Sequence, residues 1–176
     1  MMDGAVADAV AERSNASSRR GVILAAGVAA AVLLIDQITK AWAETALADG
    51  KALHVMWTLR FLLHHNSGMA FSQGLGKGPL IAVVALVVVG FLAWSLRQPR
   101  SRLYALCVGL VMGGALGNVI DRLVRAEDGF LSGRVIDFID FQWWPVFNVA
   151  DMGVVVGAAC LMYESWRHGR RDRITL

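Results

Sequence analysis

Two runs of 18 residues without a charged side chain constrain the fold of this sequence more than any other feature. They cover Pro79 to Leu96 and Leu103 to Ile120. A helix of about 20 apolar residues crosses a hydrocarbon core of roughly 30 Å, and it satisfies its own backbone hydrogen bonds there. Both runs are therefore predicted to be membrane-spanning helices.

Two further runs meet the same requirement with polar residues at their ends. Gly21 to Ile35 carries no charge over 15 residues and continues into Asp36-Gln-Ile-Thr-Lys40. Pro145 to Tyr163 contains a single acid, Asp151. A composition of 56% hydrophobic and 18% charged residues agrees with four spans.

The predicted fold class is an all-α polytopic membrane protein with four transmembrane helices. The spans are expected at about 21–42, 79–96, 103–120 and 146–166, within a membrane domain of residues 21–166. The small, polar residues 1–20 are expected to form a disordered tail, and 167–176 a basic tail. A cleavable signal peptide is the alternative for the first run, but the helical pattern continues through Lys40, where a cleavage site would end it.

Lysine and arginine residues are unevenly distributed around these spans. Of the 17, ten precede the first span, lie in the short turn between the second and third, or follow the fourth: Arg13, Arg19, Arg20, Arg97, Arg100, Arg102, Arg167, Arg170, Arg171 and Arg173. Because cytoplasmic loops carry the excess of basic residues, both termini are predicted to be cytoplasmic, and loops 43–78 and 121–145 to face outward. This topology explains the net charge of +3, so no nucleic acid is expected as a partner.

Polar residues gather at the outward end of the predicted helices. The ends of the spans hold Asp36, Lys40, Asn118, Asp121, Arg122, Asn148 and Asp151, and the outward loops add Asn66 and Asp137. Each has a structural interpretation. Asp36 and Lys40 have the spacing of an ion pair on one helix, and Asn148 is a favourable N-cap with Asp151 three residues later. Helix capping alone does not explain why so many polar groups converge on one level.

Two kinds of chemistry are considered for these groups. His64 and His65 are adjacent, so on a strand they point to opposite faces, and no further ligand completes a metal site. We therefore expect no metal and no cofactor. Two carboxylates that share one proton would suit amide hydrolysis, since one activates water while the other protonates the leaving nitrogen. Spacing alone leaves the partner of Asp151 open among three acids, Asp121, Asp137 and Asp140.

Five sequence blocks in order resemble the lipoprotein signal peptidases, signal peptidase II. The blocks are Asp36-Gln-Ile-Thr-Lys40, Asn66-Ser-Gly-Met-Ala-Phe71, Gly113-Gly-Ala-Leu-Gly-Asn-Val-Ile-Asp-Arg122, Gly133-Arg-Val-Ile-Asp-Phe138 and Phe147-Asn-Val-Ala-Asp151. The resemblance covers residues 21 to about 166. This sequence departs from the family pattern in the long segment between Asp121 and Asp137. It also departs at Met69 and Met152, which replace smaller residues.

The resemblance implies an aspartic endopeptidase with Asp137 and Asp151 as the catalytic pair. Asp121 then supports the site, and Asp140 takes no part in the reaction. The residues implied to line the pocket or hold the dyad are Asn66, Gly68, Asn118, Arg122 and Asn148, with Asp36 and Lys40 bracing it from the first span.

The implied substrate is a bacterial prolipoprotein whose lipobox Cys carries a diacylglyceryl group, cleaved just before that Cys. The enzyme is expected to be monomeric, in lipid, in the bacterial inner membrane, with its site at the extracytoplasmic face. Trp143, Trp144, Phe138 and Phe141 are expected either to rim the site or to form an ordinary aromatic belt. The β-rich residues 51–72 predict a small extracytoplasmic β element.

Two other classes of protein remain as alternatives. A transporter or channel subunit would use the acids as an ion path, but the segments Ile81 to Leu92 and Val154 to Leu161 contain no ionisable side chain other than Cys160. A non-catalytic scaffold with capped and ion-paired helix ends predicts that Asp137→Asn and Asp151→Asn cost only stability.

Overall fold

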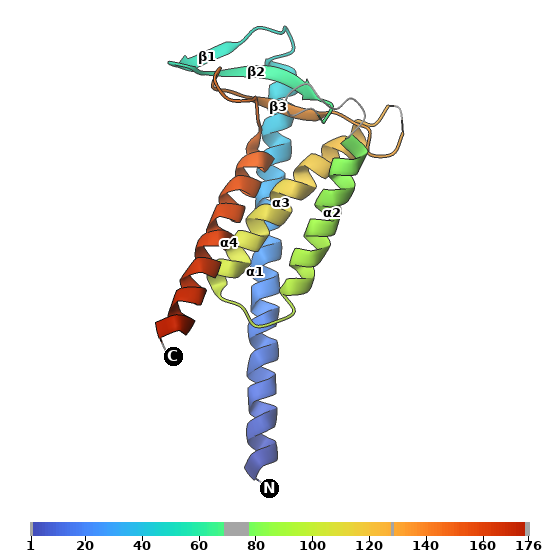
Figure 1. Ribbon diagram of the computed structural model, residues 1–176. Coiled ribbons are helices and arrows are strands. Elements are labelled where there is room, and N and C mark those ends of the chain that lie inside the picture. The colour runs from blue at the N-terminus through green and yellow to red at the C-terminus, as the bar shows by residue number, and fades with distance from the viewer. Residues whose placement is uncertain (1, 69–77, 128, 175–176) are drawn as a thin grey trace.

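Helix α3 (Arg102–Val124) is the element around which the other helices are arranged. In this computed structural model it packs against α1 (Met2–Ala46), α2 (Gly78–Ser95) and α4 (Val149–Ile174), as Figure 1 shows. The structure describes residues 2–68, 78–127 and 129–174. Met69, Ala70 and Phe71 of the second sequence block lie outside the described residues.

Small residues let α3 approach its neighbours closely. A Cβ atom added to Gly113 would lie 2.6 Å from the carbonyl oxygen of Ala29 on α1, and one added to Gly117 would lie 2.6 Å from the Asp36 carboxylate. Neither position has room for a side chain, so glycine spacing sets the distance between the helices. The Gly113-x-x-x-Gly117 spacing therefore allows α1 and α3 to approach closely.

Three helices in the described part of the chain are long and apolar enough to cross a membrane: residues Glu12–Ala46 of α1, all of α2 and all of α3. Helix α4 is outside this set because it combines Asp151 and Glu164 with a polar C-terminal end. The exposed surface of α4 still carries apolar side chains, with Val155 67% and Met162 68% exposed. The fourth span therefore stays a prediction. Both termini lie at the end of the bundle away from the sheet (Figure 1).

The N-terminal segment differs from the sequence expectation. Residues 1–20 were expected to form a disordered tail, but α1 is continuous from Met2 through the first predicted span. Residues 5–20 are rich in Ala and contain neither Gly nor Pro, so nothing in them interrupts a helix.

A small antiparallel sheet closes one end of the bundle. Its strands are β1 (Leu53–Met56), β2 (Leu59–Asn66) and β3 (Val135–Asp140), in the order β1-β2-β3. The predicted β element is confirmed, and its third strand comes from the block that contains Asp137. Phe138 of β3 packs with Ala43 and Leu47 of α1, which fixes the strand over the helix ends.

Candidate active site

The start of α4 is fixed by a reciprocal pair of hydrogen bonds. The backbone N–H of Asp151 donates to Asn148 Oδ1 at 2.9 Å, and the backbone N–H of Asn148 donates to Asp151 Oδ2 at 3.3 Å. This is a capping box, which satisfies two helix-end donors at once. The prediction that Asn148 caps this helix is confirmed.

The same asparagine joins Asp151 to the other predicted catalytic residue. Asn148 Nδ2 donates to Asp137 Oδ1 at 2.7 Å, while Asn66 Nδ2 donates to Asp137 Oδ2 at 2.9 Å. Asp137 is 1% exposed. A residue on β3 and a residue in the first turn of α4 are therefore brought to one site, although the sequence separates them by 14 positions.

Three asparagine amides face the two carboxylates, and a donor on each Oδ1 fixes which way the amide points. Asn66 Oδ1 accepts from the N–H of Gly68 at 2.9 Å. Asn118 Oδ1 accepts from Lys40 Nζ at 3.0 Å, which turns its Nδ2 toward Asp151 Oδ1 at 2.8 Å. Because each oxygen is already engaged, each NH₂ group is directed at an acid.

The backbone geometry at position 68 requires a glycine. Its φ of +103° lies in the left-handed region, and a Cβ atom there would lie 3.0 Å from the backbone nitrogen of Gly78, the first residue of α2. A side chain would strain this turn and push α2 away. Gly68 therefore acts through the backbone, by orienting Asn66.

A buried ion network lies beneath the asparagines. Lys40 Nζ contacts Asp36 Oδ2 at 2.8 Å and Asp121 Oδ2 at 2.7 Å, and all three side chains are fully buried. The Asp36–Lys40 ion pair predicted from their spacing is confirmed, with Asp121 as an additional partner. Asp36 Oδ1 also accepts from the N–H of Ala150 at 2.8 Å, so α1 holds the first turn of α4.

Asp121 connects this network to the strand that carries Asp137. Its Oδ2 accepts from the N–H of Ile136 at 3.2 Å, and its Oδ1 accepts from Arg125 Nη1 at 2.7 Å. Arg125 in turn pairs with Glu44 at 2.7 Å. Sequence reasoning missed Arg125 and Glu44, because an Arg four residues after Asp121 was the only signal and it resembles any surface pair.

An apolar groove of about 810 Å³ opens beside this site. Asp151, Asn118 and Arg122 form its polar part. The rest is lined from α2 by Ile81, Ala82, Ala85 and Val88, from α3 by Val111, Ala115 and Val119, from α4 by Val154 and Val155, and from the preceding loop by residues 143–147. Arg122 Nη1 donates to the carbonyl of Gly133 at 3.2 Å, which ties the groove wall to the long loop. The groove can therefore hold an extended apolar chain against Asp151.

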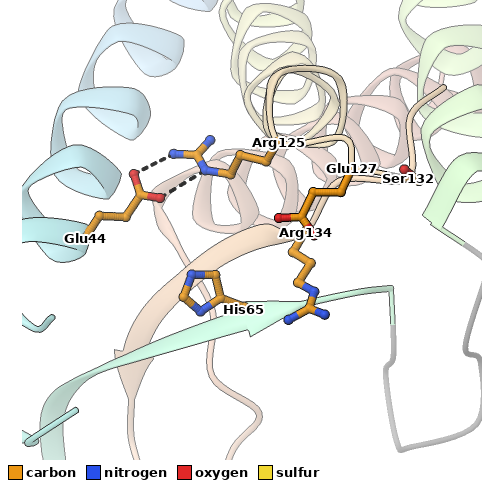
Figure 2. Close-up of a pocket in the computed structure, with 6 residues that line it drawn as sticks. All are labelled: Glu44, His65, Arg125, Glu127, Ser132 and Arg134. Atoms are coloured by element: carbon orange, nitrogen blue, oxygen red, sulfur yellow. Dashed lines mark hydrogen bonds and ion pairs between the residues drawn. The ribbon is translucent and has the colours of Figure 1, made fainter. Parts of the chain in front are cut away.

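A second, polar pocket of about 360 Å³ lies behind Asp121. Its lining residues, drawn in Figure 2, are Glu44, His65, Arg125, Glu127, Ser132 and Arg134. It contains neither Asp137 nor Asp151. Within the residues that the structure describes, no group of three or more His, Cys, Asp or Glu side chains could hold a metal ion.

Asp140 lies in a different environment from Asp137. Arg60 Nε of β2 contacts its Oδ2 at 2.7 Å, and the N–H of Gln142 donates to its Oδ1 at 2.6 Å. Asp137 thus remains the catalytic candidate, whereas Asp140 forms an ion pair within the sheet.

The expected aromatic rim needs one correction. Trp143 and Trp144 are exposed and line the groove, but Phe138 is 3% exposed and packs against Phe61 and Trp42. Successive residues of a strand face opposite sides, so Phe138 points away from Asp137 and into the sheet–helix core. Phe141 stacks on Phe147.

Asp137 gives the folded state a pH dependence. Burial raises the pKa of Asp137 to about 7, with the charge of Asp151 adding to the rise and the hydrogen bonds from Asn66 and Asn148 opposing it. Between about pH 4 and 7 the folded protein therefore binds more protons than the unfolded chain, and its free energy of unfolding falls as pH rises. The full shift corresponds to roughly 4 kcal/mol. Asp137→Asn is expected to reduce this slope in unfolding temperatures measured across that range, with Asp151 left as the other acid of the site.

Asp140→Asn is the control for this measurement. Burial acts to raise the pKa of Asp140, but the Gln142 N–H and Arg60 outweigh it and lower the pKa. Asp140 therefore adds stability above its unfolded pKa and loses it as pH falls, the opposite sign. The slope between about pH 4 and 7 should be unchanged in Asp140→Asn, and a slope equally unchanged in Asp137→Asn would contradict the raised pKa of Asp137.

Comparison with known proteins identifies the family of the chain. The family described as signal peptidase (SPase) II matches residues 28–167. The chain is 42% identical over 147 residues to the lipoprotein signal peptidase of Mycobacterium leprae, covering 83% of this chain and 73% of that protein. It is 41% identical over 147 residues to that of Mycobacterium avium, covering 83% and 80%. A solved bacterial membrane enzyme, determined by the in meso method, superimposes with a TM-score of 0.70 at 26% identity, over 81% of this chain and 87% of the other. The family match spans most of the sequence, and the chain therefore belongs to the signal peptidase II family.

Proposed function

We propose that this protein is an aspartic endopeptidase that removes the signal peptide from diacylglyceryl-modified bacterial prolipoproteins, cutting just before the lipidated Cys. The observation that carries the proposal is Asn148, which hydrogen-bonds Asp137 with its side chain and Asp151 with its backbone N–H. Family membership supports the substrate, since the relatives are lipoprotein signal peptidases.

Hydrolysis follows from one proton shared by the two carboxyl groups. The ionised carboxylate takes a proton from water as the water oxygen bonds to the scissile carbonyl carbon. The protonated carboxyl group donates its proton to the leaving nitrogen as the C–N bond breaks, and the proton taken from water restores the pair. Asp137 and Asp151 titrate as a pair, and the N–H groups of Asn66, Asn118 and Asn148 stabilise its negative charge.

The groove supports a lipid-bearing substrate. Its walls are apolar and its polar part is confined to Asp151, Asn118 and Arg122. An apolar signal helix and acyl chains would stay in contact with Val, Ile and Trp side chains while the peptide bond meets the dyad. In this proposal α4 is a fourth span, both termini are cytoplasmic, and the enzyme acts as a monomer at the extracytoplasmic face of the inner membrane.

The depth of the charged groups argues against an ion path. Asp36, Lys40, Asp121, Asp137 and Asp151 form one connected cluster at the sheet end. Below it, α3 and α4 meet through apolar residues such as Val111 and Gly157. A path for ions needs polar groups at successive depths.

The test is cleavage by the purified protein in lipid. A diacylglyceryl-modified precursor should yield a product whose first residue is the lipidated Cys, identified by mass spectrometry. The same precursor without the diacylglyceryl group is the control and should be cleaved far more slowly. Equal cleavage of both precursors would overturn the lipid specificity, and no cleavage of either would overturn the peptidase assignment.

A further inference from the structure

A second charged feature lies at the opposite end of the bundle from the dyad. A cavity of about 700 Å³ is lined by residues of α1 and of the turn between α2 and α3, and four of its lining residues are arginines: Arg13, Arg20, Arg100 and Arg102. Figure 1 shows this turn passing beside the lower part of α1. We call the cavity the arginine pocket. Its remaining lining is small or apolar, with Leu24 and Gly21 on the side nearer the dyad.

The arrangement of the four arginines follows from the two elements. Arg13 and Arg20 are seven residues apart, so they lie on the same face of α1, two turns from each other. Arg100 lies in the turn and Arg102 begins α3. Two segments distant in sequence therefore direct like charges at one space, and the summed positive charge attracts an anion there.

These charges are available to a ligand. All four side chains are exposed, and no carboxylate whose side chain the structure describes forms an ion pair with any of them. Arg100 lies over the Tyr104 ring, 5.2 Å from its centroid, and donates to Gln98 Oε1 at 3.4 Å, but both partners are neutral. Arg60 and Arg125, at the sheet end, are each paired with acids. The nearby Glu164 accepts a hydrogen bond from the Ser101 hydroxyl and lines a neighbouring cavity, which Arg100 also lines.

The pocket lies at the level of the opposite membrane surface. Arg20 precedes Lys40 by 20 residues on the unbroken helix α1, which corresponds to about 30 Å, one hydrocarbon thickness. When Lys40 lies at one headgroup layer, the arginine pocket lies at the other. A site at this depth meets phosphate groups that are fixed to acyl chains, and Leu24 offers those chains an apolar contact.

We propose that the arginine pocket binds the phosphate of an anionic phospholipid headgroup at the membrane surface opposite the dyad. This site is separate from the peptidase chemistry and does not depend on it. Basic pockets between helices at the cytoplasmic surface favour such headgroups because the guanidinium groups engage the phosphate by charge and hydrogen bonding.

The test compares two sets of four substitutions with the same change in net charge. The pocket variant carries Arg13→Gln, Arg20→Gln, Arg100→Gln and Arg102→Gln. The control variant carries Arg19→Gln, Arg97→Gln, Arg167→Gln and Arg170→Gln, which are exposed arginines that do not line the arginine pocket. Full-length proteins in neutral detergent are titrated with dioleoylphosphatidylglycerol, and the rise in unfolding temperature and the lipid retained in native mass spectrometry are measured.

Wild type and the control variant should bind dioleoylphosphatidylglycerol equally, and the pocket variant at least about tenfold more weakly. Dioleoylphosphatidylcholine and inorganic phosphate at the same concentrations should give little rise. Equal weakening of both variants would overturn the proposal, because net charge alone would then explain binding. Undiminished binding by the pocket variant, or an equal response to phosphatidylcholine, would also overturn it. An equal response to inorganic phosphate would assign the pocket to a free anion and overturn the lipid assignment.

Discussion

Asp137→Asn and Asp151→Asn are each expected to lower the rate of precursor cleavage by about 10³-fold or more. A carboxamide can neither take a proton from water nor deliver one to the leaving nitrogen, and general acid–base catalysis contributes roughly 10² to 10⁴ in rate. Both variants should remain folded. In each variant the NH₂ group of the new asparagine would face a hydrogen-bond donor, which costs about 1–3 kcal/mol. The donor belongs to Asn66 or Asn148 at position 137, and to Asn118 or Asn148 at position 151.

The measurement pairs cleavage with thermal unfolding, and activity is recorded well below the lower unfolding temperature. Asp140→Asn is the matched control, because it removes a carboxylate from the same strand. That carboxylate pairs with Arg60 and does not face the dyad. It should retain activity within about threefold of wild type. If either dyad variant also retains this much activity, that carboxylate is structural and the scaffold interpretation gains support.

Lys40→Met is expected to lower the free energy of unfolding by about 3–5 kcal/mol, the usual effect of removing one partner from a buried ion pair. The ammonium group is fully buried between Asp36 and Asp121, so its loss leaves Asp36 without a cation and Asp121 with Arg125 as its remaining cation. Cleavage should fall as well, because Lys40 also orients the Asn118 amide toward Asp151.

Lys51→Met is the control for this substitution. Lys51 pairs with Asp49, but its side chain is 85% exposed, and such pairs contribute little, so the change should stay within about 0.5 kcal/mol. Chemical unfolding in mixed micelles measures both variants. Adding Asp36→Asn and Asp121→Asn to Lys40→Met should recover part of the loss. A loss below about 1 kcal/mol in Lys40→Met alone would contradict an ionised, tightly coupled cluster.

Much of this site could be predicted because membrane sequences restrict polar residues so strongly. The apolar runs locate α1, α2 and α3, and the acids near their ends stand out because a charge inside a bilayer needs a partner or a function. The Asp36–Lys40 pair and the Asn148 cap follow from spacing on a single helix. Each of these interactions is local, so periodicity is enough to find it.

The interactions that sequence reasoning missed are long-range or depend on the sheet. Arg125 reaches Glu44 across 81 residues, and no periodic pattern connects them. The pairing of β2 with β3 decides that Asp137 faces the helix ends while Phe138 turns into the core. The sequence of neither strand predicts which strand it pairs with. The continuation of α1 through residues 2–20 was missed because a small, polar composition also fits a disordered tail.

Asn118 lies between the dyad and the buried ammonium group of Lys40. Lys40 makes no direct contact with Asp151, because the Asn118 amide lies between them and accepts from Lys40 on one side and donates to Asp151 on the other. A direct lysine–aspartate contact would favour the ionised form of the acid and hold both carboxylates without a proton. The neutral amide instead acts as a spacer between the ammonium group and the carboxylate. It passes on the orientation that the lysine imposes and keeps the ammonium group out of direct contact with the acid, and so leaves the pair free to gain and release the single proton on which each turnover depends.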